Sequence, residues 1–274
     1  MEKFKFCILF ADNPALDPAQ IAPGWEMAEI PVALLVKPFE SEANWEDTRA
    51  QIQAWNLPPI KGASHFIQFA GLTPMGAAAD WEQLEFWAKR AFRRLGALGV
   101  EYAGLYGGFF KIPDGVSRTQ ATDQAIRWLN MLADYAEPNH VKLMLEPTAD
   151  PHTLLPMYLD GLNFVKKEIK RDSVRVMADL NYFIQGNQPL EHIAEDPAYC
   201  LHVHIAGVEA QPGVGDRVEL HTHLFRVLRE IGYTGGVSAA CPWVSTQGGA
   251  IDFRYETAQS LKYLQDLREK VYAE

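Results

Sequence analysis

Eight short apolar segments, most of them separated by an amphipathic helix, constrain the fold of this chain more than any other feature of its sequence. Each segment is rich in β-branched or aromatic residues and is followed by a polar or Gly/Pro-containing turn, which is typical of buried β-strands. The predicted strands cover residues 5–10, 27–36, 65–70, 102–106, 141–146, 174–179, 201–205 and 236–240. Helical periodicity predicts helices at residues 80–98, 121–137, 153–170, 218–231 and 256–272.

Strands that alternate with helices are expected to be parallel, because each helix returns the chain to the starting edge of the sheet. Eight such units in 274 residues favour an α/β fold with a single (β/α)₈ TIM barrel, which typically needs ~250 residues. An open doubly wound sheet is disfavoured, since no GxGxxG sequence follows the first strand. No shift in composition marks a domain boundary, so residues 1–274 are interpreted as one domain. The second unit has the weakest pattern, and its proline-rich segment 57–62 is either an ordinary loop or an irregular part of that unit.

The amino-acid composition excludes some classes of binding partner for this chain. The chain has 25 Lys+Arg against 35 Asp+Glu and a formal net charge of -10, which repels the phosphates of a nucleic acid. Cys7, Cys200 and Cys241 are too few and too scattered for a disulfide framework or a CxxC metal site. The first apolar run is broken by Asp12 and Pro14 and is shorter than a signal-peptide core or a membrane span. We therefore expect a cytoplasmic protein with no nucleic acid or membrane partner.

Three consecutive predicted strands end in a side chain that can bind a metal ion, namely Glu146, Asp179 and His204. Each alone could be a turn residue or a packed histidine, but three in succession favour a shared site, because the C-terminal ends of barrel strands form the active site. Two carboxylates and an imidazole suit a divalent ion. We expect Mn²⁺, with Mg²⁺, Fe²⁺, Co²⁺ and Zn²⁺ as alternatives. His202 points to the same face one layer deeper, either as a partner of the site or as a core residue.

Further candidates lie beyond the predicted strand ends. Arg217, on the loop after the seventh strand, either clamps a substrate oxygen or phosphate with its guanidinium or is a solvated loop residue. Four aromatic residues could stack on the apolar face of a sugar, although aromatic residues at a barrel rim also pack against neighbouring loops. These residues are Trp25, Phe109, Phe110 and Trp243.

The ordered set of motifs resembles the xylose-isomerase-like TIM barrels, the sugar-phosphate isomerase/epimerase superfamily. The resemblance covers most of the chain and rests on GWEMAEI, YAEPNHVKLMLEP, the strand that ends at Asp179, HVHIAG, PGVGD and IGYTGGVS. It implies one divalent metal ion held by Glu, Asp, His and a second Glu from strands five to eight, with the two Glu residues acting as acid and base. Glu146, Asp179 and His204 match the first three ligands.

The sequence departs from this family pattern at three positions. Ala240 stands where the family usually has the second Glu of GYxGxVSxE, and Tyr182 and Gly207 stand where it often has His and Asp. An epimerase needs a proton donor or acceptor on each face of the reacting carbon. If Ala240 is the native residue, the site fits a reaction that needs a base on one face only, helped by Tyr182 or His202. The alternative explanation is that Ala240 results from a deliberate Glu-to-Ala substitution.

These observations predict a metal-dependent sugar, sugar-phosphate or polyol isomerase or epimerase that removes a proton next to a carbonyl to give an enediolate. Glu146, Tyr182 and His202 are its predicted catalytic residues. One alternative is a lyase or deglycosidase that acts on a 3-keto-glycoside. Another is a catalytically dead carbohydrate-binding or partner subunit that has lost the second Glu. In each case the expected ligand is a small carbohydrate, and the chain could form a homo-oligomer or join a partner subunit.

Overall fold

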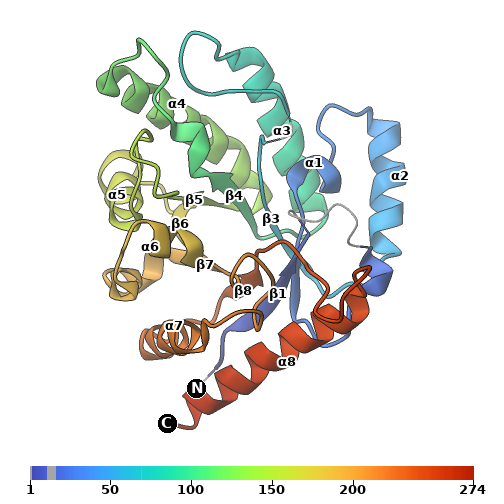
Figure 1. Ribbon diagram of the computed structural model, residues 1–274. Coiled ribbons are helices and arrows are strands. Elements are labelled where there is room, and N and C mark those ends of the chain that lie inside the picture. The colour runs from blue at the N-terminus through green and yellow to red at the C-terminus, as the bar shows by residue number, and fades with distance from the viewer. Residues whose placement is uncertain (1, 11–16, 69) are drawn as a thin grey trace.

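The computed structural model of the chain, which describes residues 2–10, 17–68 and 70–274, contains eight parallel strands that close into a barrel (Figure 1). The strands follow one another around the barrel in chain order, and β8 pairs with β1 to close it. This arrangement confirms the predicted (β/α)₈ fold. The strands are β1 Lys5–Leu9, β2 Met27–Glu29, β3 Ile60–Ala63, β4 Tyr102–Tyr106, β5 Lys142–Glu146, β6 Val174–Asp179, β7 Cys200–Ile205 and β8 Gly236–Ala239.

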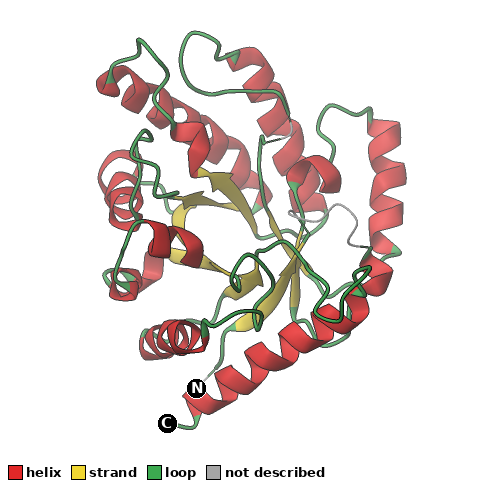
Figure 2. Cartoon of the chain, viewed as in Figure 1, coloured by secondary structure: helices red, strands yellow, loops and turns green. Residues whose placement is uncertain are grey.

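The helices surround the barrel (Figure 2). They are α1 Val32–Leu35, α2 Glu42–Gln53, α3 Trp81–Ala97, α4 Arg118–Ala136, α5 Tyr158–Phe164, α6 Leu180–Gln185, α7 Val218–Glu230 and α8 Phe253–Tyr272. The sequence patterns predict α3, α4, α7 and α8 closely, and α5 together with the π-helical turn Val165–Ile169 covers the C-terminal part of the third predicted helix, residues 153–170. They do not predict α1, α2 or α6. Within the described part of the chain, no helix combines the length and apolarity needed to cross a membrane.

The prediction for the third strand is wrong. The strand forms at Ile60–Ala63, within the proline-rich segment, and not at residues 65–70. The side chains of Phe66 and Ile67 are nonetheless buried, because the loop after β3 folds back over the core. An apolar run therefore marks burial here without marking a strand.

The second predicted strand, residues 27–36, divides at Pro31. β2 ends at Glu29, and the apolar residues Val32–Leu35 form one helical turn with Pro31 at its N-cap. Proline has no backbone N–H to donate to a sheet, and its fixed φ suits the start of a helix. The division places Glu29 at the C-terminal end of a strand.

Side chains along the strands alternate between two environments. Ile8 and Leu145 belong to the large core between the sheet and the helices, whereas the inward-facing residues form a small separate cluster made of Cys7, Met27, Tyr102, Met144 and Met177. The register of the parallel ladders places Asp179 opposite His204 and His204 opposite Ser238. Polar residues of β6, β7 and β8 therefore lie at one level near the C-terminal mouth.

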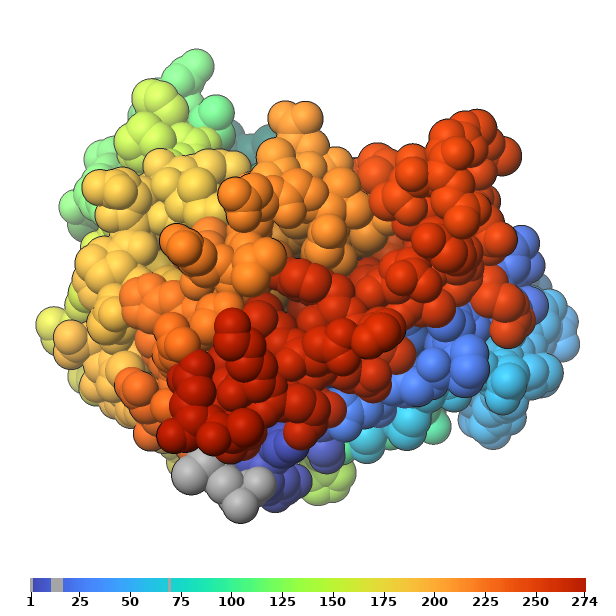
Figure 3. Space-filling view, turned by 60° about the horizontal axis from the view of Figure 1, so that its bottom comes forward, coloured from blue at the N-terminus to red at the C-terminus, as the bar shows by residue number. Residues whose placement is uncertain are grey.

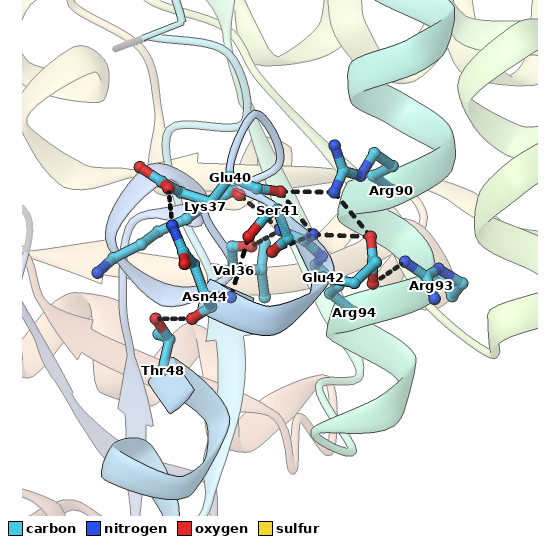
Figure 4. Close-up of polar contacts among 10 residues, drawn as sticks. All are labelled: Val36, Lys37, Glu40, Ser41, Glu42, Asn44, Thr48, Arg90, Arg93 and Arg94. Carbon is cyan, nitrogen blue, oxygen red and sulfur yellow. Dashed lines mark hydrogen bonds and ion pairs between the residues drawn. The ribbon is translucent and has the colours of Figure 1, made fainter. Parts of the chain in front are cut away.

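Arg94 of α3 fixes the segment between α1 and α2 (Figure 4). Its buried guanidinium donates hydrogen bonds of 2.5 to 3.4 Å to the carbonyl oxygens of Val36, Lys37, Glu40 and Ser41. The carboxylate of Glu42, the first residue of α2, also receives hydrogen bonds from Arg90, Arg93 and Arg94. One arginine thus satisfies the carbonyl groups after α1 and anchors the connection that follows β2.

The two ends of the chain meet where the barrel closes. α8 lies along the N-terminal segment, as Figure 3 shows from the side of the C-terminus. Lys3 Nζ lies 2.5 Å from Glu269 Oε2, and Arg268 donates a 2.6 Å hydrogen bond to the carbonyl oxygen of Phe4. α8 therefore covers the junction at which β1 pairs with β8.

Candidate metal and substrate site

The structure brings the three predicted metal ligands together. Glu146 ends β5, Asp179 ends β6, and His204 lies one residue before the end of β7. The Nδ1 atom of His204 lies 3.6 Å from Glu146 Oε1 and 3.6 Å from Asp179 Oδ2. One ligand atom from each residue falls within 4.8 Å of the others, so the three could share one ion. Asp179 also caps α6 by accepting a 2.7 Å hydrogen bond from the Asn181 backbone N–H.

The carboxyl groups of this cluster are close together and shielded from water, which disfavours their charged forms. Burial raises the pKa of the Glu146 carboxyl, and the neighbouring His204 offsets only part of this effect. Burial alone would lower the pKa of the His204 imidazole, but the charge of Glu29 and the nearby carboxylates of Asp179 and Glu146 raise it well above its usual value. The cluster therefore favours a positive charge between its carboxylates, which a proton or a metal cation can supply.

Glu29, at the end of β2, is a member of this site that the sequence analysis missed. Its carboxylate is fully buried, and its Oε2 atom accepts a 2.7 Å hydrogen bond from the Ser238 hydroxyl. The same oxygen lies 3.0 Å from His202 Nε2 and 3.3 Å from His204 Nε2. Although burial opposes ionisation, the charges of His204 and His202 hold the pKa of Glu29 well below its usual value. The sequence does contain one signal for Glu29, because it is the single charged residue within the apolar run 27–36.

His202 lies beneath the site. Its ring is fully buried, stacks at 4.7 Å on the Tyr102 ring, and places Nε2 2.7 Å from Ser238 Oγ. Glu29, His202 and His204 also have the spacing of a metal-binding group. However, their contacts through Glu29 Oε2 are of hydrogen-bond length, so protons account for them. His202 is therefore a partner of the site and does not line the cavity.

A cavity of about 540 Å³ opens beside Glu146, Asp179 and His204. Polar side chains on its wall include His65, Gln68, Tyr106, Asn181, Tyr182, Gln185, Glu209 and Arg217. Arg217 donates hydrogen bonds to Asn181 Oδ1 at 2.7 Å and to the Ala206 carbonyl at 3.2 Å. Burial raises the pKa of Tyr182, so its hydroxyl is neutral and can donate. The cavity has the size and polarity for a small polyhydroxylated molecule.

None of the four aromatic residues predicted to stack on a sugar lines this cavity. Trp25 precedes β2 and so lies toward the opposite, N-terminal end of the barrel. Phe110 and Trp243 are buried in the core. Phe109 is half-buried and packs edge-on against Tyr106 at 6.1 Å. The side chains of Trp25, Phe110 and Trp243 are covered by protein, as is common for aromatic residues at a barrel rim.

Ala240 lies on the cavity wall, directly after β8. Its backbone N–H donates a 3.0 Å hydrogen bond to the Ile205 carbonyl, so the residue continues the pairing of β8 with β7. Only 9% of its surface is exposed. A longer side chain at position 240 would extend from the cavity wall to which Ala206 and Pro242 also belong. The position expected to carry a second Glu therefore does border the site.

Comparisons with known proteins agree on the fold. Residues 23–267 match the family described as xylose isomerase-like TIM barrel. D-psicose 3-epimerase from Clostridium cellulolyticum H10, solved with D-tagatose, is similar at 18% identity over 97% of this chain and 99% of that chain, with a TM-score of 0.73. The 3-keto-D-glucoside 4-epimerase from E. coli is similar at 20% identity over 96% and 100%, with a TM-score of 0.72. The IOLI protein, solved with a zinc atom, is similar at 17% identity over 98% of each chain, with a TM-score of 0.69. No curated protein sequence matches the chain.

Proposed function

Because the chain belongs to the xylose isomerase-like TIM barrel family, as its sequence motifs predict, we propose that it is a metal-dependent isomerase or epimerase of a small carbohydrate. The observation that carries this proposal is the convergence of Glu146, Asp179 and His204 on one side of a polar cavity. The sugar epimerases among the similar structures support a carbohydrate as the substrate class.

The donor set fits a divalent ion. Two carboxylates and one imidazole nitrogen match the ligand types of Mn²⁺, our first choice, and of Mg²⁺, Co²⁺, Fe²⁺ and Zn²⁺. Glu146, Asp179 and His204 would hold the ion, and their two negative charges would balance it. Such an ion, when bound, polarises the carbonyl group of the substrate and so acidifies the neighbouring carbon.

Each cavity residue has a distinct role in this proposal. Glu146 takes the proton from the carbon next to the carbonyl, because its carboxylate ends β5 on the cavity wall, where it can reach a substrate carbon. Tyr182 donates a hydrogen bond from its neutral hydroxyl to a substrate oxygen. Arg217, held by Asn181, binds another oxygen with its guanidinium. His202 contacts no substrate, since it does not line the cavity.

The methyl group of Ala240 favours a second candidate function. A two-base epimerase needs an acid or base on the far face of the reacting carbon, where Ala240 offers none. Elimination from a 3-keto-glycoside needs only one base. Glu146 would remove the proton from the carbon between the ketone and the anomeric centre, a carbon–carbon double bond would form, and the aglycone would leave with the electrons of the glycosidic bond.

Metal content and turnover of the purified protein test both candidates. We expect about one divalent ion per chain, and conversion of either free ketoses or 3-keto-glycosides when the two classes are screened in parallel. Asp179→Asn should lose the ion and slow turnover by about 10²-fold or more, because a Lewis acid contributes several kcal/mol to the transition state. Elemental analysis and product detection by NMR make these measurements.

Asp252→Asn is the matched control. Asp252 caps α8 as Asp179 caps α6, by accepting a backbone hydrogen bond, but it does not line the cavity. The control should keep both the ion and the turnover. Full activity in metal-free protein would exclude metal dependence. Sugar binding without conversion of either substrate class would instead identify the chain as a binding protein.

A further inference from the structure

Glu29 contacts the side of the His204 ring that faces away from the other two predicted metal ligands. It comes from β2, which β8 and β1 separate from β7 in the barrel, and its carboxylate contacts both His202 and His204. Its Oε2 atom faces Nε2 of His204, whereas Glu146 and Asp179 face Nδ1 of the same ring. The imidazole therefore lies between two acidic groups.

The protons around Glu29 can be assigned by donor and acceptor chemistry. An ionised carboxylate can only accept hydrogen bonds. The single hydroxyl proton of Ser238 points to Glu29 Oε2 at 2.7 Å, so Ser238 Oγ accepts the proton of His202 Nε2 at 2.7 Å. His204 Nε2, at 3.3 Å from Glu29, must likewise carry a proton. A neutral His204 then has its lone pair on Nδ1, directed toward Glu146 and Asp179.

We propose that Glu29 is a positioning residue, which fixes the Nε2–H form and the ring orientation of His204 so that Nδ1 is available to a metal ion. This inference rests on the metal site proposed above. The buried location of Glu29 supports it, because a hydrogen bond between a carboxylate and a histidine strengthens away from water. The far-side partner of a metal-binding histidine commonly sets its tautomer and raises its basicity.

The register of the barrel explains why this contact forms. Ser238 lies opposite His204 on β8, so its hydroxyl reaches the same carboxylate oxygen that His204 approaches. The hydroxyl of Ser238 and Nε2 of His204 both donate to Oε2, while Oε1 of Glu29 has no hydrogen-bond partner among the described residues. A glutamine at this position could present its carbonyl oxygen to the same donors, but without the negative charge. Leucine would keep the approximate volume and offer no acceptor.

Metal titration of three variants tests the proposal. With Mn²⁺ alone as the probe, in isothermal titration calorimetry, we expect Glu29→Leu to weaken binding by about 10- to 100-fold. Glu29→Gln should fall between Glu29→Leu and the natural protein, since it keeps an acceptor. Glu256→Gln is the matched control, because Glu256 is equally buried but bonds to Gln211 and Thr246, away from His204. Its Mn²⁺ affinity should not change.

NMR of the metal-free protein supplies a readout that does not depend on the metal. The Nε2–H proton of His204 should give a protected resonance in the natural protein and in Glu29→Gln, and an unprotected one in Glu29→Leu. If Glu29→Leu fails to fold, the comparison of Glu29→Gln with Glu256→Gln in the titration decides.

The outcomes separate the two proposals. Unchanged Mn²⁺ affinity in a folded Glu29→Leu, or equal losses in Glu29→Gln and Glu256→Gln, would overturn the positioning role. If the natural protein binds no divalent ion, the proposed function fails. The His204 resonance then still decides the role of Glu29, since loss of its protection in Glu29→Leu supports that role and its persistence contradicts it.

Discussion

The wall of the cavity near the end of β8 consists of small side chains, and Ala240 is the residue whose replacement is most informative. It borders the same cavity as Glu146, and its backbone is fixed by pairing with β7. A carboxylate added here would face the site from a strand that supplies no ligand. It would add both a negative charge for a cation and an acid or base on the second face of the substrate.

Ala240→Glu is therefore expected to bind Mn²⁺ more tightly and to turn over faster by a factor of ~10² to 10⁴, the usual contribution of one general acid or base. Ala240→Gln adds nearly the same volume without the charge and should show neither gain. Calorimetry and steady-state kinetics on the substrate found by screening make the comparison. If Ala240→Glu turns over more slowly than the natural protein, the cavity is built for one base and the elimination reaction is favoured.

The sequence predicts some site residues and not others for local reasons. Glu146, Asp179 and His204 were predictable because each lies at the end of a strand whose neighbours in the chain are apolar. Glu29 was hidden because Pro31 ends its strand inside a continuous apolar run, so the carboxylate read as an interior position. Sequence does not show which aromatic residues near the strand ends are covered by protein, and Phe110 and Trp243 belong to the core.

At the scale of elements, the loop from α1 to α2 depends on one side chain of α3. The Arg94 guanidinium is fully buried and serves four carbonyl groups and the Glu42 carboxylate (Figure 4). Arg93 reaches the same carboxylate, but its side chain is 56% exposed. The two arginines are neighbours in the helix, but the side chain of Arg94 is fully buried and that of Arg93 is more than half exposed.

Arg94→Met should lower the free energy of unfolding by about 2–4 kcal/mol, because it leaves buried carbonyl groups without a donor. Arg93→Met should cost less than about 1 kcal/mol, as for other exposed ion pairs. Urea unfolding followed by circular dichroism measures both. Equal losses of unfolding free energy in Arg94→Met and Arg93→Met would show that the charge of the cluster determines the stability and that the burial of Arg94 does not.

Elements were predictable where the periodicity and the caps agree. α3 begins after Asp80, whose side chain accepts from the Gln83 backbone, and the prediction started at the same residue. α4 begins three residues earlier than its apolar pattern indicates, because Ser117 and Gln120 form a capping box. β3 was missed because its four residues carry little apolar pattern, while the loop after it is apolar and buried. Short strands in a barrel are specified by their neighbours in the sheet more than by their own sequence.

At the scale of the whole molecule, the barrel places the candidate site where strands distant in the chain converge. Glu146, Asp179 and His204 come from the adjacent strands β5, β6 and β7, and Glu29 of β2 meets His204 only when β8 pairs with β1 to close the barrel. An unfolded chain offers no such group of ligands. A metal ion that binds here should therefore bind the folded state alone and stabilise it by mass action.

Removal of the metal with a chelator should lower the melting temperature, and Mn²⁺ at about 100 times its Kd should restore about 2.7 kcal/mol of stability. For a chain of this size that free energy corresponds to a shift of roughly 5–10 °C in Tm.

The formal net charge of -10 also attracts cations without any specific site, so KCl at equal ionic strength is the first control. Asp179→Asn, which keeps the barrel but lacks one ligand charge, is the second. Calorimetric scans should show the shift with Mn²⁺ in the natural protein and in Asp252→Asn, and not in Asp179→Asn. An equal shift in Asp179→Asn, or with KCl, would show that the cations act on the acidic surface and not between the strand ends.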